Sequence, residues 1–183
     1  MKNTVVALFF FLFLTSVAFA NSSPAAGSTR DSINLTGMVY NNNDRVKGVV
    51  VNVYLNNKLY KKVEARSSNR FRTYLPKNAM VTIEITAPEF HAKRFLFNTN
   101  LPDKLKVLPK YQFDIDLFKE AEITGVNTSI LDFPVGLVQY DEKKGEFIRD
   151  KKYTKKMKKA YLELWEEAQM AERSGLKEEE VKE

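Results

Sequence analysis

Residues 49–65, VVVNVYLNNKLYKKVEA, decide the fold class of this chain. Val49, Val51 and Val53 fall on one face of an extended strand, so that face can be buried while the other is exposed. The pair Asn56-Asn57 supplies two residues that tolerate a positive φ angle, as a tight two-residue hairpin requires. We therefore predict two neighbouring antiparallel strands joined at this asparagine pair.

The same alternation of apolar and polar residues recurs on both sides of this hairpin, from residue 33 to residue 119. Turn residues interrupt it, most clearly in the run of residues 41–44, NNND. We expect strands near residues 33–40, 49–55, 58–65, 70–75, 81–86, 90–99 and 113–117. Such a density of short strands is typical of transthyretin-like or immunoglobulin-like folds. We therefore predict a mainly β, seven-stranded sandwich domain at residues 33–119.

Residues 120–183 change character and form a separate predicted region. An apolar stretch at 129–140, a turn at 141–145 and Phe147 predict a hairpin. From Tyr153 the apolar period becomes helical, which predicts an amphipathic helix of about five turns that ends near Ser174-Gly175. We expect one face of this helix to contact a partner or to pack on the sandwich. That candidate face comprises Tyr153, Met157, Tyr161, Leu164 and Trp165.

The first 20 residues are typical of a removable export signal. Lys2 precedes an apolar run, and Ala18-Phe19-Ala20 provides the small-x-small pattern that signal peptidase recognises, so cleavage is expected between Ala20 and Asn21. An uncleaved anchor is the alternative, although the apolar run is short for a bilayer core. Residues 21–32, rich in Ser, Ala, Gly and Asn, are expected to form a disordered leader.

Four segments carry a resemblance to a known family: residues 35–40, LTGMVY; 46–54, VKGVVVNVY; 69–71, NRF; and 75–76, LP. Together they resemble the carboxypeptidase regulatory-like domain, a transthyretin-like sandwich that accompanies many exported bacterial proteins. Segments 93–99, 113–118, 131–140 and 147–153 are similar to small exported envelope proteins of the Bacteroidetes. The chain departs from the family at Arg70, where a glycine is usual. The resemblance implies a non-enzymatic protein located in the periplasm or on the surface of a Gram-negative bacterium.

Composition excludes several kinds of chemistry. The chain has no cysteine and one histidine, His91, so thiolate metal sites and most histidine-dependent hydrolases are excluded. Asp114 and Asp116 share one face of a strand and, with Asp103 or Glu84, could ligate calcium, but a solvated strand face is the simpler interpretation. The same pair is a weak candidate for glycosidase carboxylates. We predict no catalytic residue, metal or cofactor. The modest net charge of +6 does not indicate nucleic-acid binding.

Tyrosines provide the more informative pattern. Alternation places Tyr40, Tyr54, Tyr60 and Tyr74 on the outer side of their strands, where they could stack on glycan rings or contact a peptide. The alternative is that the chain's own C-terminal hairpin and helix cover them. The sequence therefore predicts an interaction or assembly module that binds envelope proteins, or a carbohydrate- or peptidoglycan-binding module. Six lysines in residues 151–159 allow peripheral membrane contact at most.

Overall fold

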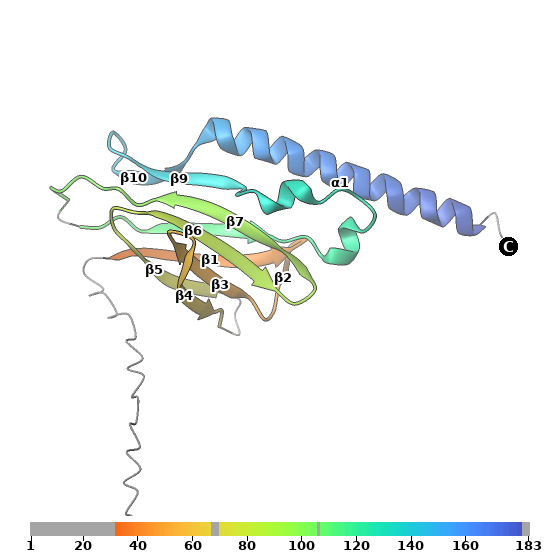
Figure 1. Ribbon diagram of the computed structural model, residues 1–183, viewed down its shortest axis with the longest axis horizontal. Coiled ribbons are helices and arrows are strands. Elements are labelled where there is room, and N and C mark those ends of the chain that lie inside the picture. Colours follow the sequence, from red (N-terminus) through yellow and green to blue (C-terminus); the bar gives the residue numbers. More distant parts are fainter. Residues whose placement is uncertain (1–31, 67–69, 106, 181–183) are drawn as a thin grey trace, which may run out of the picture.

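The computed structural model describes residues 32–66, 70–105 and 107–180 (Figure 1). The predicted signal with its cleavage site, and all of the predicted leader except Ser32, lie outside these residues, as does Asn69. Within the described ranges the chain forms ten strands, two 3-10 helices and one α-helix. They are β1 (Ser32–Asn41), β2 (Asp44–Arg45), β3 (Val50–Leu55), β4 (Lys58–Glu64), β5 (Arg70–Pro76), β6 (Met80–Ala87), β7 (Phe90–Asn98), β8 (Tyr111–Asp116), η2 (Glu120–Ile123), η3 (Ser129–Asp132), β9 (Gly136–Asp141), β10 (Glu146–Arg149) and α1 (Lys151–Glu180).

The strands form two sheets, which confirms the predicted mainly β, sandwich-like fold. In the first sheet β1 lies between β5 and β8, and the short β2 pairs with the end of β1. The second sheet has the order β10-β9-β7-β6-β3-β4. The described residues contain three strands beyond the seven expected. One is β2, which is only two residues long, and the other two are β9 and β10, which join the second sheet.

The decisive hairpin forms as predicted. Asn56 and Asn57 both have positive φ angles, 50° and 60°, and β3 pairs with β4 in antiparallel register from Leu55 and Lys58 onward. A second asparagine pair, Asn42 and Asn43, has φ angles of 48° and 72° and joins β1 to β2. Asparagine serves at these positions because its short polar side chain tolerates the left-handed conformation.

The core lies between the two sheets and follows the predicted alternation. Its buried residues include Val51 and Val53 of β3, Ile83 of β6, Leu35 of β1 and Phe71 of β5. Phe113 of β8 makes edge contacts with the rings of Phe71 and Phe95, at centroid distances of 6.1 and 5.0 Å. Burial of these side chains is the main force that holds the sheets together.

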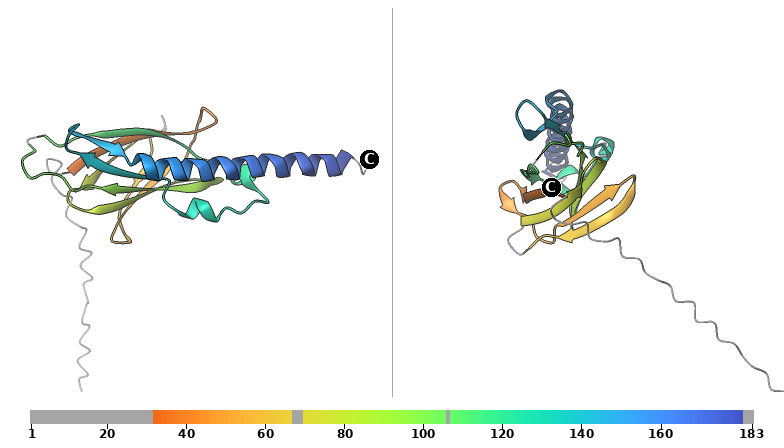
Figure 2. Two further views of the ribbon diagram at one scale, coloured as in Figure 1. Left: turned by 90° about the horizontal axis from the view of Figure 1, so that it is seen from above. Right: turned by 90° about the vertical axis from the view of Figure 1, so that its left-hand side faces the viewer.

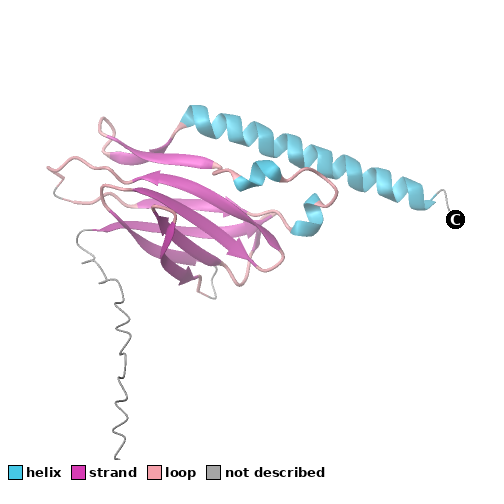
Figure 3. Ribbon diagram, in the orientation of Figure 1, coloured by secondary structure: helices cyan, strands magenta, loops and turns pink. Residues whose placement is uncertain are grey.

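The C-terminal hairpin, β9 and β10, does not stand apart from the sandwich. β9 pairs with β7 in parallel from Phe95↔Gly136 to Asn98↔Gln139, so the hairpin widens the second sheet by two strands. Asn41 of β1 holds η2 beside the sandwich, because its amide donates hydrogen bonds to the Leu117 carbonyl and to the Glu122 carboxylate of η2. In Figure 3 the long helix α1 runs along one side of the strands.

The helix α1 is longer than the sequence predicts. Its 30 residues span about 45 Å at 1.5 Å per residue, and it extends past the end of the sheets (Figure 2). The predicted end near Ser174-Gly175 is wrong, since good helix formers at 176–180, LKEEE, continue the helix through a glycine that costs only about 1 kcal/mol. The Asp150 carboxylate caps the other end by accepting a hydrogen bond from the Tyr153 backbone N–H, at 2.8 Å.

Candidate functional site

The structure separates the four candidate tyrosines. Tyr40 of β1 and Tyr74 of β5 lie on the outer face of the first sheet, where their neighbours along each strand are buried. Tyr54 lies on the outer face of the second sheet, on the other side of the sandwich. The tyrosines therefore form no common array, and α1 does not cover them, because it packs against η2, η3 and β9.

The predicted outward orientation of Tyr60 is wrong. A register shift between Val53 and Tyr54 inserts an extra residue into β4, so that Val53 pairs with Lys61 while Tyr54 pairs with Leu59. Such a bulge reverses the inward and outward alternation beyond it. Tyr60 is consequently half-buried and packs against the core between the sheets.

Tyr54 belongs to a polar network that crosses three strands of the second sheet. Glu84 of β6 accepts hydrogen bonds from Tyr54 at 3.0 Å, from Asn52 at 3.2 Å and from Arg94 of β7 at 2.9 Å. Burial acts to raise the pKa of Glu84, but these three hydrogen bonds and the positive charge of Arg94 together hold the pKa below its usual value. Arg94 also donates to the Asp132 carbonyl in η3, so the network fixes η3 against the sheet.

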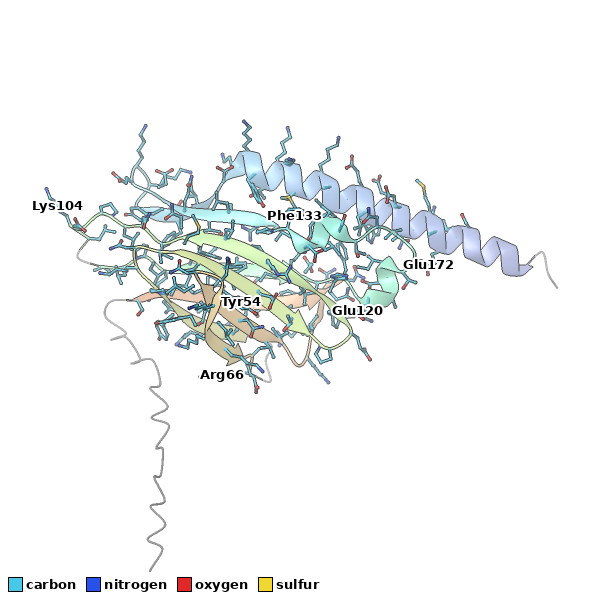
Figure 4. The ribbon with its side chains drawn as sticks, in the orientation of Figure 1. Tyr54, Arg66, Lys104, Glu120, Phe133 and Glu172 are labelled. Carbon is cyan, nitrogen blue, oxygen red and sulfur yellow. The ribbon has the colours of Figure 1, made fainter. Side chains whose placement is uncertain are left out.

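A basic cleft opens where the edge strands β4 and β5 of the two sheets meet. Its volume is about 700 Å³, and Lys61 of β4 lies 5.6 Å from the centre of the Tyr74 ring. Figure 4 places Arg66 at this lower edge of the sandwich, away from α1. Sequence reasoning missed the cleft, although Arg70 and Arg72, two residues apart, already indicated a basic strand face. The cleft is lined by Met38, Arg45, Lys61, Val63, Glu64, Arg66, Arg70, Phe71, Arg72 and Tyr74.

Four of the five residues of the predicted partner face of α1 are used within the chain. Met157, Tyr161 and Leu164 are buried against η2 and η3, and Tyr153 packs beside them and donates to the Pro134 carbonyl at 2.7 Å. The expectation that they contact a partner is thereby corrected, because the apolar residues of η2 and η3 fill that face. Trp165 remains 43% exposed.

The outer side of α1 carries exposed apolar side chains instead. Leu162 is 50% exposed and lies one turn from Trp165, and Met170 is 66% exposed. At 3.6 residues per turn Leu162 lies between the other two around the helix axis, about 60° from Trp165 and about 80° from Met170, so the three side chains span about 140° of the helix surface. We call Leu162, Trp165 and Met170 the outer strip. Exposed residues of both charges lie beside the strip: Lys158, Lys159, Glu163 and Glu166.

The acidic residues considered for calcium do not converge. Asp114 and Asp116 are exposed on the outer face of the first sheet, whereas Glu84 lies on the outer face of the second. His91 is half-buried in β7, and its backbone N–H donates to the Phe118 carbonyl. Across the described ranges no three histidine or acidic side chains are grouped as metal ligands would be. The described helices also include none with the length and apolar character needed to cross a membrane.

No protein-family model matches the chain, and no curated protein sequence does either. Solved structures similar to part of it include S.CueP, with 13% identity, a TM-score of 0.35 and coverage of 49% of this chain and 64% of that one. The 3-chlorocatechol 1,2-dioxygenase from Rhodococcus opacus 1CP matches with 11% identity and a TM-score of 0.36, over 49% of this chain and 60% of that one. The dioxygenase domain of a dioxygenase carbohydrate-binding protein fusion from Streptomyces sp. SirexAA-E matches with 11% identity and a TM-score of 0.36, over 52% and 84%.

The chain thus spans less than two thirds of the length of the first two of these structures. At TM-scores below 0.5 the similarity carries no argument about activity, ligand or partner. The function has to be argued from the residues of this chain.

Proposed function

We propose that this chain is a non-enzymatic exported envelope protein that acts as an interaction and assembly module, docking a protein partner through the outer strip of α1. The observation that carries the proposal is the exposure of Leu162, Trp165 and Met170 on a helix whose opposite face is anchored by buried residues. Export, and a location in the periplasm or on the cell surface, belong to the same proposal and rest on residues 1–20.

The buried face of α1 holds the helix in place, so the outer strip lies on a rigid support. Leu164 and Ala168 are each only 3% exposed, and they fix the rotation of the helix about its axis. A partner therefore need not order the helix when it binds, which lowers the entropic cost of association. Trp165 is the natural anchor, because tryptophan is enriched among residues that dominate binding energy.

The surroundings of the strip define the chemistry of the partner. Lys158, Lys159, Glu163 and Glu166 border it, and Glu163 is paired with Lys159 at 3.3 Å. The complementary surface is an apolar groove whose rim carries charges of both signs, of the kind that receives an amphipathic helix. Peripheral contact with anionic lipid is the competing use of this helix and would involve its lysine-rich first turns.

Site-specific cross-linking in intact cells tests the proposal. A photo-crosslinking phenylalanine derivative replaces Trp165 in the full chain. The matched control carries it at Lys156, which is nine residues earlier and so about 180° around the helix. We expect one discrete protein adduct from position 165, absent from position 156 and lost when Met170→Glu is added.

Equal adducts from both positions, or none from position 165, would contradict docking by the outer strip. Adducts to lipid alone from both positions would favour the peripheral membrane interpretation.

The basic cleft supports a second candidate function, the binding of a glycan. It contains Tyr74, one of the predicted sugar-stacking tyrosines, and five cationic side chains against the single carboxylate of Glu64. Such a site favours an acidic polysaccharide over a neutral one, since each cation adds attraction that salt screens. We expect retention on immobilised polygalacturonate at low salt, and loss of it in Arg70→Ala/Arg72→Ala. Equal retention of that variant would contradict this use of the cleft.

A further inference from the structure

A second cavity lies at the opposite edge of the sandwich, under the first turns of α1. It has a volume of about 350 Å³, and strands of both sheets and α1 contribute to its walls. This places it within the size range of pockets that hold small molecules. It is separate from the outer strip and from the basic cleft. The residues that line it are Lys93, Phe95, Asp114, Ile115, Asp116, Val135, Gly136, Arg149, Thr154, Met157, Lys158 and Tyr161.

A half-buried lysine is the main polar group of this cavity. The Nζ of Lys93 donates to the backbone carbonyl of Asp116 and lies 5.0 Å from the centre of the Tyr161 ring and 5.4 Å from that of Phe118. Burial lowers the pKa of Lys93 to about 8, although the Asp116 carboxylate acts to raise it. Arg149 lowers it further by repulsion. Among the described residues the ammonium is held by the Asp116 carbonyl and by the faces of Tyr161 and Phe118, and the Asp116 carboxylate only partly offsets the cost of its burial.

Two residues of α1 that line the same cavity, Thr154 and Tyr161, have buried hydroxyl groups. Tyr161 is 9% exposed, and among the described residues no group hydrogen-bonds its hydroxyl. The Oγ1 of Thr154 is equally without a partner there. A helical threonine ordinarily donates to the carbonyl four residues earlier, here that of Asp150, but this bond is not formed. Because buried polar groups are almost always paired, two such hydroxyls in one cavity indicate a ligand acceptor atom.

The rest of the cavity specifies the body of the ligand and the charge at its mouth. Phe95, Ile115, Val135 and Met157 provide apolar walls. The charged residues that line the cavity are Asp114 and Asp116 of β8, Arg149 at the end of β10, Lys158 of α1 and Lys93 itself. Three cations thus oppose two carboxylates, which leaves an excess positive charge next to the unpaired hydroxyls.

We propose that this cavity binds a small carboxylate with an apolar body, whose oxygens accept hydrogen bonds from Tyr161 and Thr154 and face the ammonium of Lys93. A neutral carbonyl would satisfy the hydroxyls but would not neutralise the lysine, whereas a carboxylate does both. The carboxylate is supplied either by a free acid or by the C-terminal residue of a peptide, because the two present the same group.

Calorimetric titration of the exported chain with hexanoate tests this proposal, with hexanamide as the neutral control. We expect hexanoate to bind at pH 7 and to bind at least tenfold more weakly at pH 9.5, where Lys93 loses its proton. Hexanamide should bind at least tenfold more weakly than hexanoate at pH 7. The peptide Ala-Ala-Leu and its C-terminal amide distinguish a peptide source from a free acid.

Conservative variants identify the groups involved. Tyr161→Phe retains the ring that packs against η2 and η3, and Thr154→Val retains the shape of threonine, so both should fold. Each should weaken hexanoate binding about fivefold or more, and Lys93→Met should abolish it. Lys156→Met, an exposed lysine of the same helix, should leave binding unchanged.

Failure of both hexanoate and Ala-Ala-Leu to bind at millimolar concentration would overturn the proposal. So would equal binding of hexanoate and hexanamide, or unchanged affinity in Tyr161→Phe and Lys93→Met. None of these outcomes bears on the cross-linking test of the outer strip, because Leu162, Trp165 and Met170 do not line this cavity and that test measures a protein adduct.

Discussion

Lys93 should make the stability of this protein rise with pH in the alkaline range. Its pKa is about 8 in the folded chain, against 10.5 for an unperturbed lysine. Between these two values the unfolded chain binds more protons than the folded one, so the free energy of unfolding increases as pH rises. Below pH 8 both states are protonated, and the folded state bears the full cost of the desolvated charge.

The size of this effect follows from the difference between the two pKa values. One pKa unit corresponds to about 1.4 kcal/mol, and most of the interval is crossed between pH 7 and pH 10. Lys93 should therefore contribute an increase of about 2 kcal/mol over that range. The raised pKa values of Tyr54, Tyr153 and Tyr161 make the free energy of unfolding fall as pH rises above 10. The comparison of stabilities should therefore end at pH 10.

Urea unfolding followed by the fluorescence of Trp165, the single tryptophan, measures this increase. The wild-type chain and Lys93→Met are compared at pH 7 and pH 10, and the difference between their pH increments isolates Lys93 from every other titrating group. Lys156→Met should retain the wild-type increment. If Lys93→Met gains as much stability between pH 7 and pH 10 as the wild type, the ammonium is not desolvated and the argument fails.

Three further predictions concern packing and processing. Gly37→Ala should lower the free energy of unfolding by about 1–3 kcal/mol or more, because a Cβ there would lie 2.3 Å from a backbone carbonyl oxygen of β8; an unchanged melting temperature would show that β1 and β8 can separate. Leu164→Ala should cost about 2–4 kcal/mol and accelerate hydrogen exchange in α1, whereas Leu162→Ala should stay within about 0.5 kcal/mol of wild type; equal effects would mean that the buried and exposed faces of α1 are misassigned. Mass spectrometry of the exported protein should give a chain that begins at Asn21, and an intact N-terminus in the membrane fraction would instead support the uncleaved anchor.

Local sequence patterns predicted most individual strands correctly, for a local reason. Alternation such as that of Val51 and Val53 reports burial of one face, and asparagine pairs report positive φ angles, so both signals lie within a few residues of the element they define. The predicted end of α1 failed because Gly175 is a weak stop signal when helix formers follow it. The predicted outward orientation of Tyr60 was wrong because a bulge depends on the partner strand and cannot be recognised from the alternation of its own strand.

The candidate sites depended much more on tertiary structure. Nothing local to Lys93 shows that Thr154 and Tyr161, more than 60 residues away, share its cavity. The basic cleft likewise combines Lys61 of one sheet with Arg72 of the other across an edge that only the packing of the sheets creates.

The class of the fold, the hairpin at Asn56-Asn57 and the amphipathic character of the final helix could be predicted from sequence, because periodicity and turn chemistry are local properties of the chain. Three features emerge only in the folded molecule: β9 adds to the second sheet beside β7, α1 closes one edge of the sandwich, and the other edge stays open and basic. These are choices among pairing and packing partners distant in sequence, and their free energies come from contacts that exist only once the chain has folded.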